Sequence, residues 1–156
     1  MGRYHSVQRP WFARSVARLT LLDDIRSTGL DAREVDRPAA FEDGFRIRIY
    51  PHIRILPLHS LRIDFNPLDP KTPRVHAHGP DCPAHRNPDG SLCLWYPKDS
   101  AGRRWSPGDN GVALISIVVR HLRWEAVYRE TGNWPGFEAP HGYSSPGLDE
   151  KDNVIG

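Results

Sequence analysis

Cys93 is the residue of this chain best suited to nucleophilic chemistry, because it follows a segment that must bend sharply. Pro88 presets its own φ angle, and Asp89-Gly90 adds a side chain that supports a bend and a residue free to adopt positive φ. A short apolar run from Leu92 to Tyr96 follows, and Pro97 ends it. We therefore expect a thiol that is held by its neighbours and still faces a groove.

A nucleophilic cysteine needs access, an assisted thiolate and a group that stabilises developing charge. His85 is a candidate base or hydrogen-bond donor, and Asn87 or backbone N–H groups could serve an oxyanion. Asp89 in the turn and His141 in the C-terminal segment are possible supporting residues. The alternatives are that Cys93 is a small buried hydrophobe and that His141 lies in a solvated turn.

The same region also offers a set of candidate zinc ligands. A Cys-x-x-His pair lies within it, and thiolate and imidazole are the usual ligands of structural zinc. The candidates are His76, His78, Cys82 and His85, with Cys93 as a fifth. Structural zinc sites usually join two close pairs through a longer loop, whereas Cys93 stands alone behind a turn. We therefore keep zinc as the alternative and expect no cofactor.

Length and composition favour one domain over residues 1–156. With 156 residues, of which 38% are hydrophobic, the chain can form one core, and its 15 prolines and 13 glycines indicate many turns and loops. The polar segment from about residue 143 to 156 is predicted to be a flexible tail.

Charge and cysteine content bear on location and partners. The net charge of +2 results from 21 basic and 19 acidic residues, so we expect no direct binding of nucleic acid and no attraction to anionic lipid. Two cysteines are too few for a secreted disulfide framework, and no signal peptide or membrane-spanning run is recognisable. These features predict a cytoplasmic protein that does not bind membranes.

Periodicity predicts a first helix and a sheet. Apolar residues recur at helical spacing between residues 10 and 22, with Pro10 in the first turn and a stop at residues 27–29. No structure is predicted for residues 30–42. Alternating or apolar runs predict strands over residues 45–50, 53–58 and 61–65, and a further short strand over residues 74–78. The proline-rich residues 66–73 between the last two are expected to form a crossing loop.

A long second helix should follow a polar loop over residues 98–110. Asp109 or Asn110 can cap it, and Thr131-Gly132 should end it. Its predicted core side carries Val112, Ile115, Val119, Leu122 and Ala126. Residues 134–137 should fold back over something apolar. The fold class is therefore α+β, with an N-terminal helix, an antiparallel meander of about four strands and a long C-terminal helix.

In this order of elements, and above all in the segment Pro88-Asp89-Gly90-Ser91-Leu92-Cys93-Leu94, the chain resembles a prokaryotic member of the ubiquitin-conjugating enzyme family. The resemblance implies the ubiquitin-conjugating-enzyme fold. It also implies that Cys93 receives an activated protein C-terminus as a thioester and passes it to an amine.

The sequence departs from the family at one position. Eukaryotic members carry His-Pro-Asn, with the asparagine eight positions before the cysteine, where this chain has His85. His85 therefore inherits the location of a proposed oxyanion-stabilising group, and a histidine can donate through a ring N–H or act as a base when neutral. Asn87, six positions before Cys93, is expected to brace the turn.

Compact bacterial relatives with a similar segment are known from anti-phage operons that signal with cyclic oligonucleotides. The resemblance implies a stand-alone conjugating enzyme whose partner is the cGAS-like nucleotidyltransferase encoded beside it, and whose cargo is the C-terminus of that partner. Two alternatives remain open. The chain could be a zinc-stabilised interaction module, or an inactive scaffold with the conjugating fold that only binds a partner.

Overall fold

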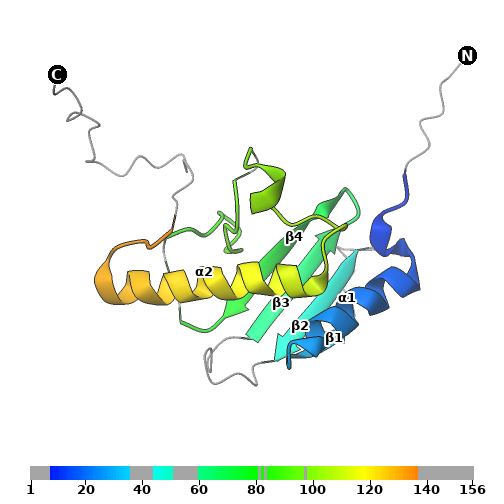
Figure 1. The fold of residues 1–156 in the computed structure, drawn as a ribbon, viewed down its shortest axis with the longest axis horizontal. Helices are drawn as coiled ribbons and strands as arrows, with labels where there is room; N and C mark the ends of the chain where they lie inside the picture. Colours follow the sequence, from blue (N-terminus) through cyan, green and yellow to red (C-terminus); the bar gives the residue numbers. More distant parts are fainter. Residues whose placement is uncertain are drawn as a thin grey trace, which may run out of the picture.

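A computed structural model describes residues 8–35, 44–50, 60–80, 82, 84–96 and 98–136. It is an α+β structure, which agrees with the predicted class (Figure 1). Its elements are, in order, η1 (Trp11–Ala13), α1 (Ser15–Ser27), β1 (Asp31–Glu34), β2 (Phe45–Tyr50), β3 (Ser60–Asn66), β4 (Asp69–His78), η3 (Ala101–Arg103) and α2 (Gly111–Thr131). Within this part of the chain, no helix has the length and apolarity needed to cross a membrane.

The first helix begins later than predicted. Pro10 precedes the 3-10 turn η1, and Arg14 is extended, with φ −86° and ψ 125°, so α1 starts only at Ser15. This break separates the apolar residues of η1 from those of the helix. Val16 and Leu19, which were expected on the apolar side, are 72% and 53% exposed. The buried face of α1 consists of Leu21, Leu22 and Ile25.

The four strands form an antiparallel meander in the order β1-β2-β3-β4. The alternation predicted for β2 and β3 is confirmed, because one face of these strands is buried. β1 lies in the segment for which no structure was predicted, and the predicted strand over residues 53–58 lies outside the described residues. The buried face carries Phe45, Ile47, Ile49, Leu61, Ile63 and Phe65.

The crossing loop predicted for residues 66–73 is wrong, since β4 already begins at Asp69. Two features allow a strand that contains Pro70 and Pro73. β4 is an edge strand, where a missing N–H leaves no neighbour unpaired. In addition, Asn66 pairs with Asp69 and Asp64 with Arg74, so residues 70–73 bulge opposite Phe65 alone.

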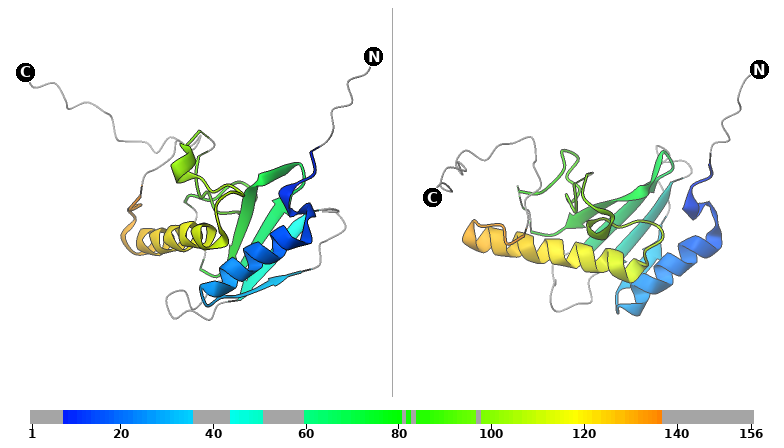
Figure 2. Two further views of the ribbon diagram at one scale, coloured as in Figure 1. Left: turned by 45° about the vertical axis from the view of Figure 1, so that its right-hand side comes forward. Right: turned by 45° about the horizontal axis from the view of Figure 1, so that its top comes forward.

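Both helices pack on the same face of the sheet, and their apolar residues share one core with the buried sides of the strands (Figures 1 and 2). Asn110 caps α2 as predicted, its side chain accepting a hydrogen bond from the Ala113 N–H at 2.8 Å. Gly132 ends the helix with φ 75°, also as predicted.

The predicted core side of α2 is only partly correct. Ile115 and Leu122 are buried, but Val112 is 40% exposed and Ala126 is exposed. The contact between α2 and α1 sets this rotation: a Cβ on Gly111 would lie 2.8 Å from the Leu21 carbonyl oxygen. The observed buried stripe contains Gly111, Leu114, Ile115, Val118, His121, Leu122 and Glu125. Two of its members are polar, and they belong to the site described next.

Candidate active site

Cys93 lies at the end of a small hairpin whose turn is formed by residues 87–90. The Cys93 N–H donates to the His85 carbonyl at 2.9 Å, and the Asn87 N–H donates to the Ser91 carbonyl at 2.8 Å. Arg86 and Leu92 form the bridge between these two bonds. His85 and Cys93 therefore face each other across the hairpin. The bend predicted before Cys93 is confirmed, and Gly90 has the expected positive φ of 83°.

Side chains inside the turn hold its shape. The Asn87 amide donates to the Ser91 hydroxyl at 2.9 Å and to the Leu92 carbonyl at 3.3 Å. The Ser91 hydroxyl and N–H in turn donate to one carboxylate oxygen of Asp89, at 2.6 and 2.9 Å. Asn87 thus braces the turn, as expected, and Asp89 does the same.

Asp89 is held in its charged form. Burial acts to raise the pKa of Asp89, but the hydrogen bonds from Ser91 and the charge of Arg74 outweigh it and lower that pKa. Arg74, on β4, lies 3.6 Å from the carboxylate. The next residues are tied to the same strand, because the Leu92 N–H donates to the Val75 carbonyl at 2.8 Å. The edge of the sheet therefore fixes the position of the hairpin.

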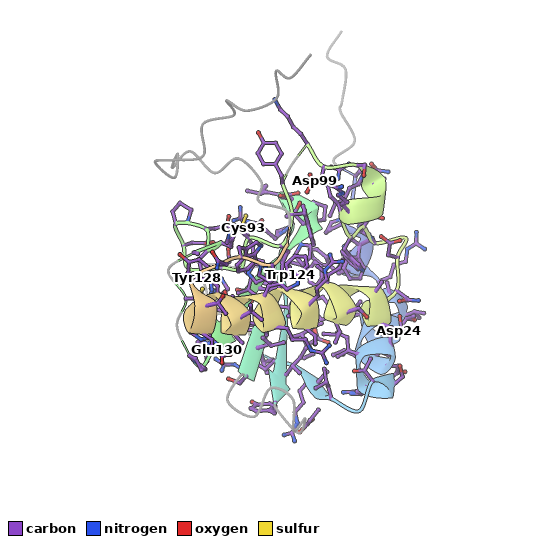
Figure 3. All side chains as sticks on the ribbon, turned by 60° about the vertical axis from the view of Figure 1, so that its left-hand side comes forward. Asp24, Cys93, Asp99, Trp124, Tyr128 and Glu130 are labelled. Carbon is purple, nitrogen blue, oxygen red and sulfur yellow. The ribbon has the colours of Figure 1, made fainter. Side chains whose placement is uncertain are left out.

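The Cys93 thiol is half-buried and is not in a disulfide, and neither is the buried Cys82. Burial first, and the carboxylate of Asp99 second, raise the pKa of the Cys93 thiol above its ordinary value. Asp99 belongs to the loop after the hairpin (Figure 3), where its carboxylate accepts a hydrogen bond from the Tyr96 N–H at 2.9 Å. At neutral pH the thiol is therefore mostly protonated, unlike the activated thiolate of a cysteine protease.

His85 has an unusual backbone conformation, and its ring stacks on an indole. Among the described residues other than glycine, His85 alone has a positive φ, of 56°. Its imidazole stacks on the Trp134 indole, with 3.8 Å between ring centroids and 23° between planes. Trp134 also contacts Trp124 and Tyr128 of α2, edge to face. The predicted return of the chain after α2 over apolar groups is thus confirmed for Trp134.

A buried ion pair joins the hairpin to α2. Arg86 donates through Nε and Nη2 to the two carboxylate oxygens of Glu125, at 2.6 and 2.8 Å, and Glu125 is fully buried. His121 Nε2 and Arg129 Nη1 lie 3.4 and 3.7 Å from the same carboxylate. Burial acts to raise the pKa of Glu125, but its contacts with His121 and Arg86 outweigh it and lower that pKa. The carboxylate is therefore charged and matched by guanidinium groups from two elements.

The four candidate zinc ligands are not gathered into a site. His76, His78, Cys82 and His85 all lie in the described part of the chain, and within that part no three His, Cys, Asp or Glu side chains form a group that could hold a metal. His76 and His78 project from the edge strand β4, whereas Cys82 is buried beyond its end. The zinc alternative gains no support from this arrangement.

Neither family models nor curated proteins nor solved structures contain a match to this chain.

The structure thus brings four of the predicted site residues together in one hairpin: His85, Asn87, Asp89 and Cys93. His141, the fifth, lies outside the described residues. Asp99 and the pair formed by Arg86 and Glu125 were not among the residues predicted from the sequence. The spacing of His121, Glu125 and Arg129, four residues apart on one helix face, was the available signal for a buried charge.

The arrangement suits acyl transfer from an activated donor. A half-buried thiol with a raised pKa is a strong nucleophile once deprotonated, because nucleophilicity increases with thiol pKa, but only a small fraction is thiolate at neutral pH. Such a thiol reacts usefully only with a carboxyl group that is already activated. The N–H groups of Asn87, Ser91, Leu92 and Cys93 already donate hydrogen bonds. The ring N–H of His85 is therefore the candidate donor to a developing oxyanion.

Proposed function

We propose that this chain is a ubiquitin-conjugating-like enzyme that carries the C-terminus of another protein as a thioester on Cys93 and passes it to an amine. The observation that carries the proposal is the rigid hairpin that presents a half-buried, unactivated thiol. The α+β arrangement of an N-terminal helix, a four-stranded meander and a long helix after the cysteine is compatible with the conjugating fold.

The proposed reaction has two steps, both of which balance without a redox partner or cofactor. In loading, the Cys93 thiolate attacks an acyl carbon already joined to a thiol or adenylate, the C–S bond forms, and the leaving group departs with its electron pair. In transfer, an amine nitrogen attacks the thioester carbon, and the C–S bond breaks. Cys93 then leaves as thiolate, and the amine loses a proton to water or to a nearby base.

The proposed cargo is the C-terminus of the cGAS-like nucleotidyltransferase encoded beside the chain in anti-phage operons, and the proposed compartment is the cytoplasm. The assignment of this partner rests on the resemblance of the segment from His85 to Cys93 to bacterial relatives. Both cysteines are thiols, which supports a reducing compartment.

The test is adduct formation with the neighbouring nucleotidyltransferase. We expect a covalent adduct that a thiol reagent cleaves, that Cys93→Ala abolishes, and that Cys93→Ser converts into an ester resistant to the same reagent. Cys82→Ala is the matched control, and it should form the adduct as the unmodified chain does. An adduct that forms in Cys93→Ala would show that another residue is the nucleophile, and full activity of Cys93→Ala in cells would favour the inactive scaffold.

A further inference from the structure

Four basic side chains form a row straight across the sheet, on the side away from both helices. The strand register places Arg33 of β1 opposite Arg48 of β2, Arg48 opposite Arg62 of β3, and Arg62 opposite His76 of β4. We call these four residues the basic row. Because neighbouring strands are about 4.8 Å apart, the row is about 14 Å long.

The basic row lies on the solvent-exposed face of the sheet. Side chains alternate between the faces of a strand, and the residues next to the row in sequence, such as Ala32, Ile47 and Ile63, point into the core. Arg33 and Arg48 are exposed, and Arg62 and His76 are half-buried. Both helices of the described chain cover the opposite face (Figure 2).

Like charges directly opposite each other in a sheet are destabilising, and two carboxylates offset part of the charge of the row. Asp31 pairs with Arg33 at 2.7 Å, and Asp64 pairs with Arg62 at 3.1 Å. Arg48, in the middle of the row, forms no ion pair within the described residues. At the end of the row, burial and then the charge of Arg62 lower the pKa of His76, so the charge of the row comes from its three arginines.

An exposed aromatic ring lies beside the row. Tyr50, two residues after Arg48 on the same face of β2, is 38% exposed, and the Arg33 guanidinium lies 5.5 Å from its ring centroid. An aromatic ring beside a line of guanidinium groups is the combination used for single-stranded nucleic acid, where bases stack and phosphates meet the charges. A membrane surface would instead require several exposed apolar side chains on this face, and its described strands offer only Tyr50.

We propose that the basic row, together with Tyr50, is a binding site for single-stranded nucleic acid whose phosphodiester backbone crosses the four strands. The small net charge of the chain does not conflict with this site, because the strand register gathers three arginines on one face and Asp31 and Asp64 offset only part of their charge. The proposal is independent of Cys93, which lies in the hairpin beyond β4, so the two proposals can fail separately.

The experiment measures binding of a fluorescein-labelled oligo(dT) of about 20 nucleotides to the full chain by fluorescence anisotropy, starting at about 50 mM salt. Arg48→Glu should weaken binding at least about tenfold and reduce the slope of log K against log salt by about one. The same substitution should leave the melting temperature unchanged or raise it, because a glutamate between Arg33 and Arg62 relieves their repulsion. A residue with a merely structural role would not combine these two effects.

Arg123→Glu is the matched control, since Arg123 is exposed on α2 and forms no ion pair within the described residues. It should change affinity less than about twofold at the same salt concentration. Tyr50→Ala should weaken binding of the single strand more than binding of a duplex, and Cys93→Ala should bind as the unmodified chain does.

Three results would overturn the proposal: no binding at low salt, equal losses in Arg48→Glu and Arg123→Glu, or binding to vesicles of anionic lipid without binding to the oligonucleotide.

Discussion

Arg86 and Glu125 form a bidentate ion pair, with N–O distances of 2.6 and 2.8 Å, that fastens the hairpin of Cys93 to the long helix α2. Arg86 also lies within hydrogen-bond range of the Gly90 carbonyl, at 3.4 Å. One guanidinium therefore contacts both the turn and the helix. The ion pair thus gives the hairpin a second attachment, in addition to the hydrogen bond from the Leu92 N–H to β4.

Replacing Glu125 should destabilise the fold, because it removes the buried carboxylate that makes two charge-assisted hydrogen bonds with the nearly buried Arg86 guanidinium. We expect Glu125→Gln to lower the free energy of unfolding in urea by about 3 kcal/mol. Glu130→Gln is the matched control on the exposed side of α2, and it should change that free energy by less than about 0.5 kcal/mol. Equal effects of the two substitutions would mean that the ion pair contributes nothing to stability.

The ion pair also predicts a specific loss of stability in acid. The pKa of Glu125 is lower in the folded chain than its ordinary value of 4.5. Its contribution to stability is therefore complete above that ordinary value and is lost as the pH falls through the lower folded value. In urea unfolding from pH 7 to pH 3, Glu125→Gln should lose less stability than the unmodified chain. If the free energy of unfolding fell with pH equally in both proteins, Glu125 would not be the carboxylate responsible for the loss of stability in acid.

Asp99 should contribute, after burial, to the raised pKa of the Cys93 thiol. Asp99→Asn removes the negative charge but keeps an oxygen that can accept from the Tyr96 N–H. The pKa of Cys93 should fall, so iodoacetamide should modify Cys93 faster at pH 7. The pH at which the modification rate reaches half its maximum should also be lower than in the unmodified chain. Asp109→Asn, in a turn with Ser106, is the control and should leave the profile unchanged. Peptide mass mapping distinguishes Cys93 from Cys82.

His85 should act mainly in transfer to the amine. The oxyanion and the amine proton develop in that step, so His85→Ala should slow transfer more than loading. The substitution also places an alanine at a φ of 56°, a strain of about 1 kcal/mol that His85→Asn and His85→Gly avoid. Stopped-flow measurement of both steps in the three variants separates these effects. If His85→Asn restores transfer and His85→Gly does not, the side chain acts as a donor; if neither step changes in His85→Ala, His85 is structural.

Local patterns predicted part of this structure well. The turn before Cys93, the alternation in β2 and β3 and both ends of α2 depend on the conformational preferences of a few adjacent residues, and the structure agrees with them. The prolines of β4 wrongly predicted a loop, because an edge strand with a bulge tolerates them and edge position is a property of the whole sheet.

Long-range contacts were beyond prediction. The burial of Glu125 depends on Arg86, 39 residues earlier in the chain, and the stacking of His85 on Trp134 depends on the return of the chain after α2. The basic row became visible only with the strand register, because Arg33, Arg48, Arg62 and His76 are dispersed in the sequence. By contrast, the hairpin residues near Cys93 are close in sequence and were found together.

The most direct test of the thioester role of Cys93 is the intact mass of the chain co-expressed with the neighbouring nucleotidyltransferase, measured with and without excess dithiothreitol. We predict a species whose mass is the sum of the two chains less one water. Dithiothreitol should cleave it by thiol exchange, which frees the Cys93 thiol and transfers the acyl group to dithiothreitol, and Cys93→Ala should lack it. An adduct that persists in Cys93→Ala would contradict the thioester role, and so would a first-formed adduct of the unmodified chain that excess dithiothreitol does not cleave.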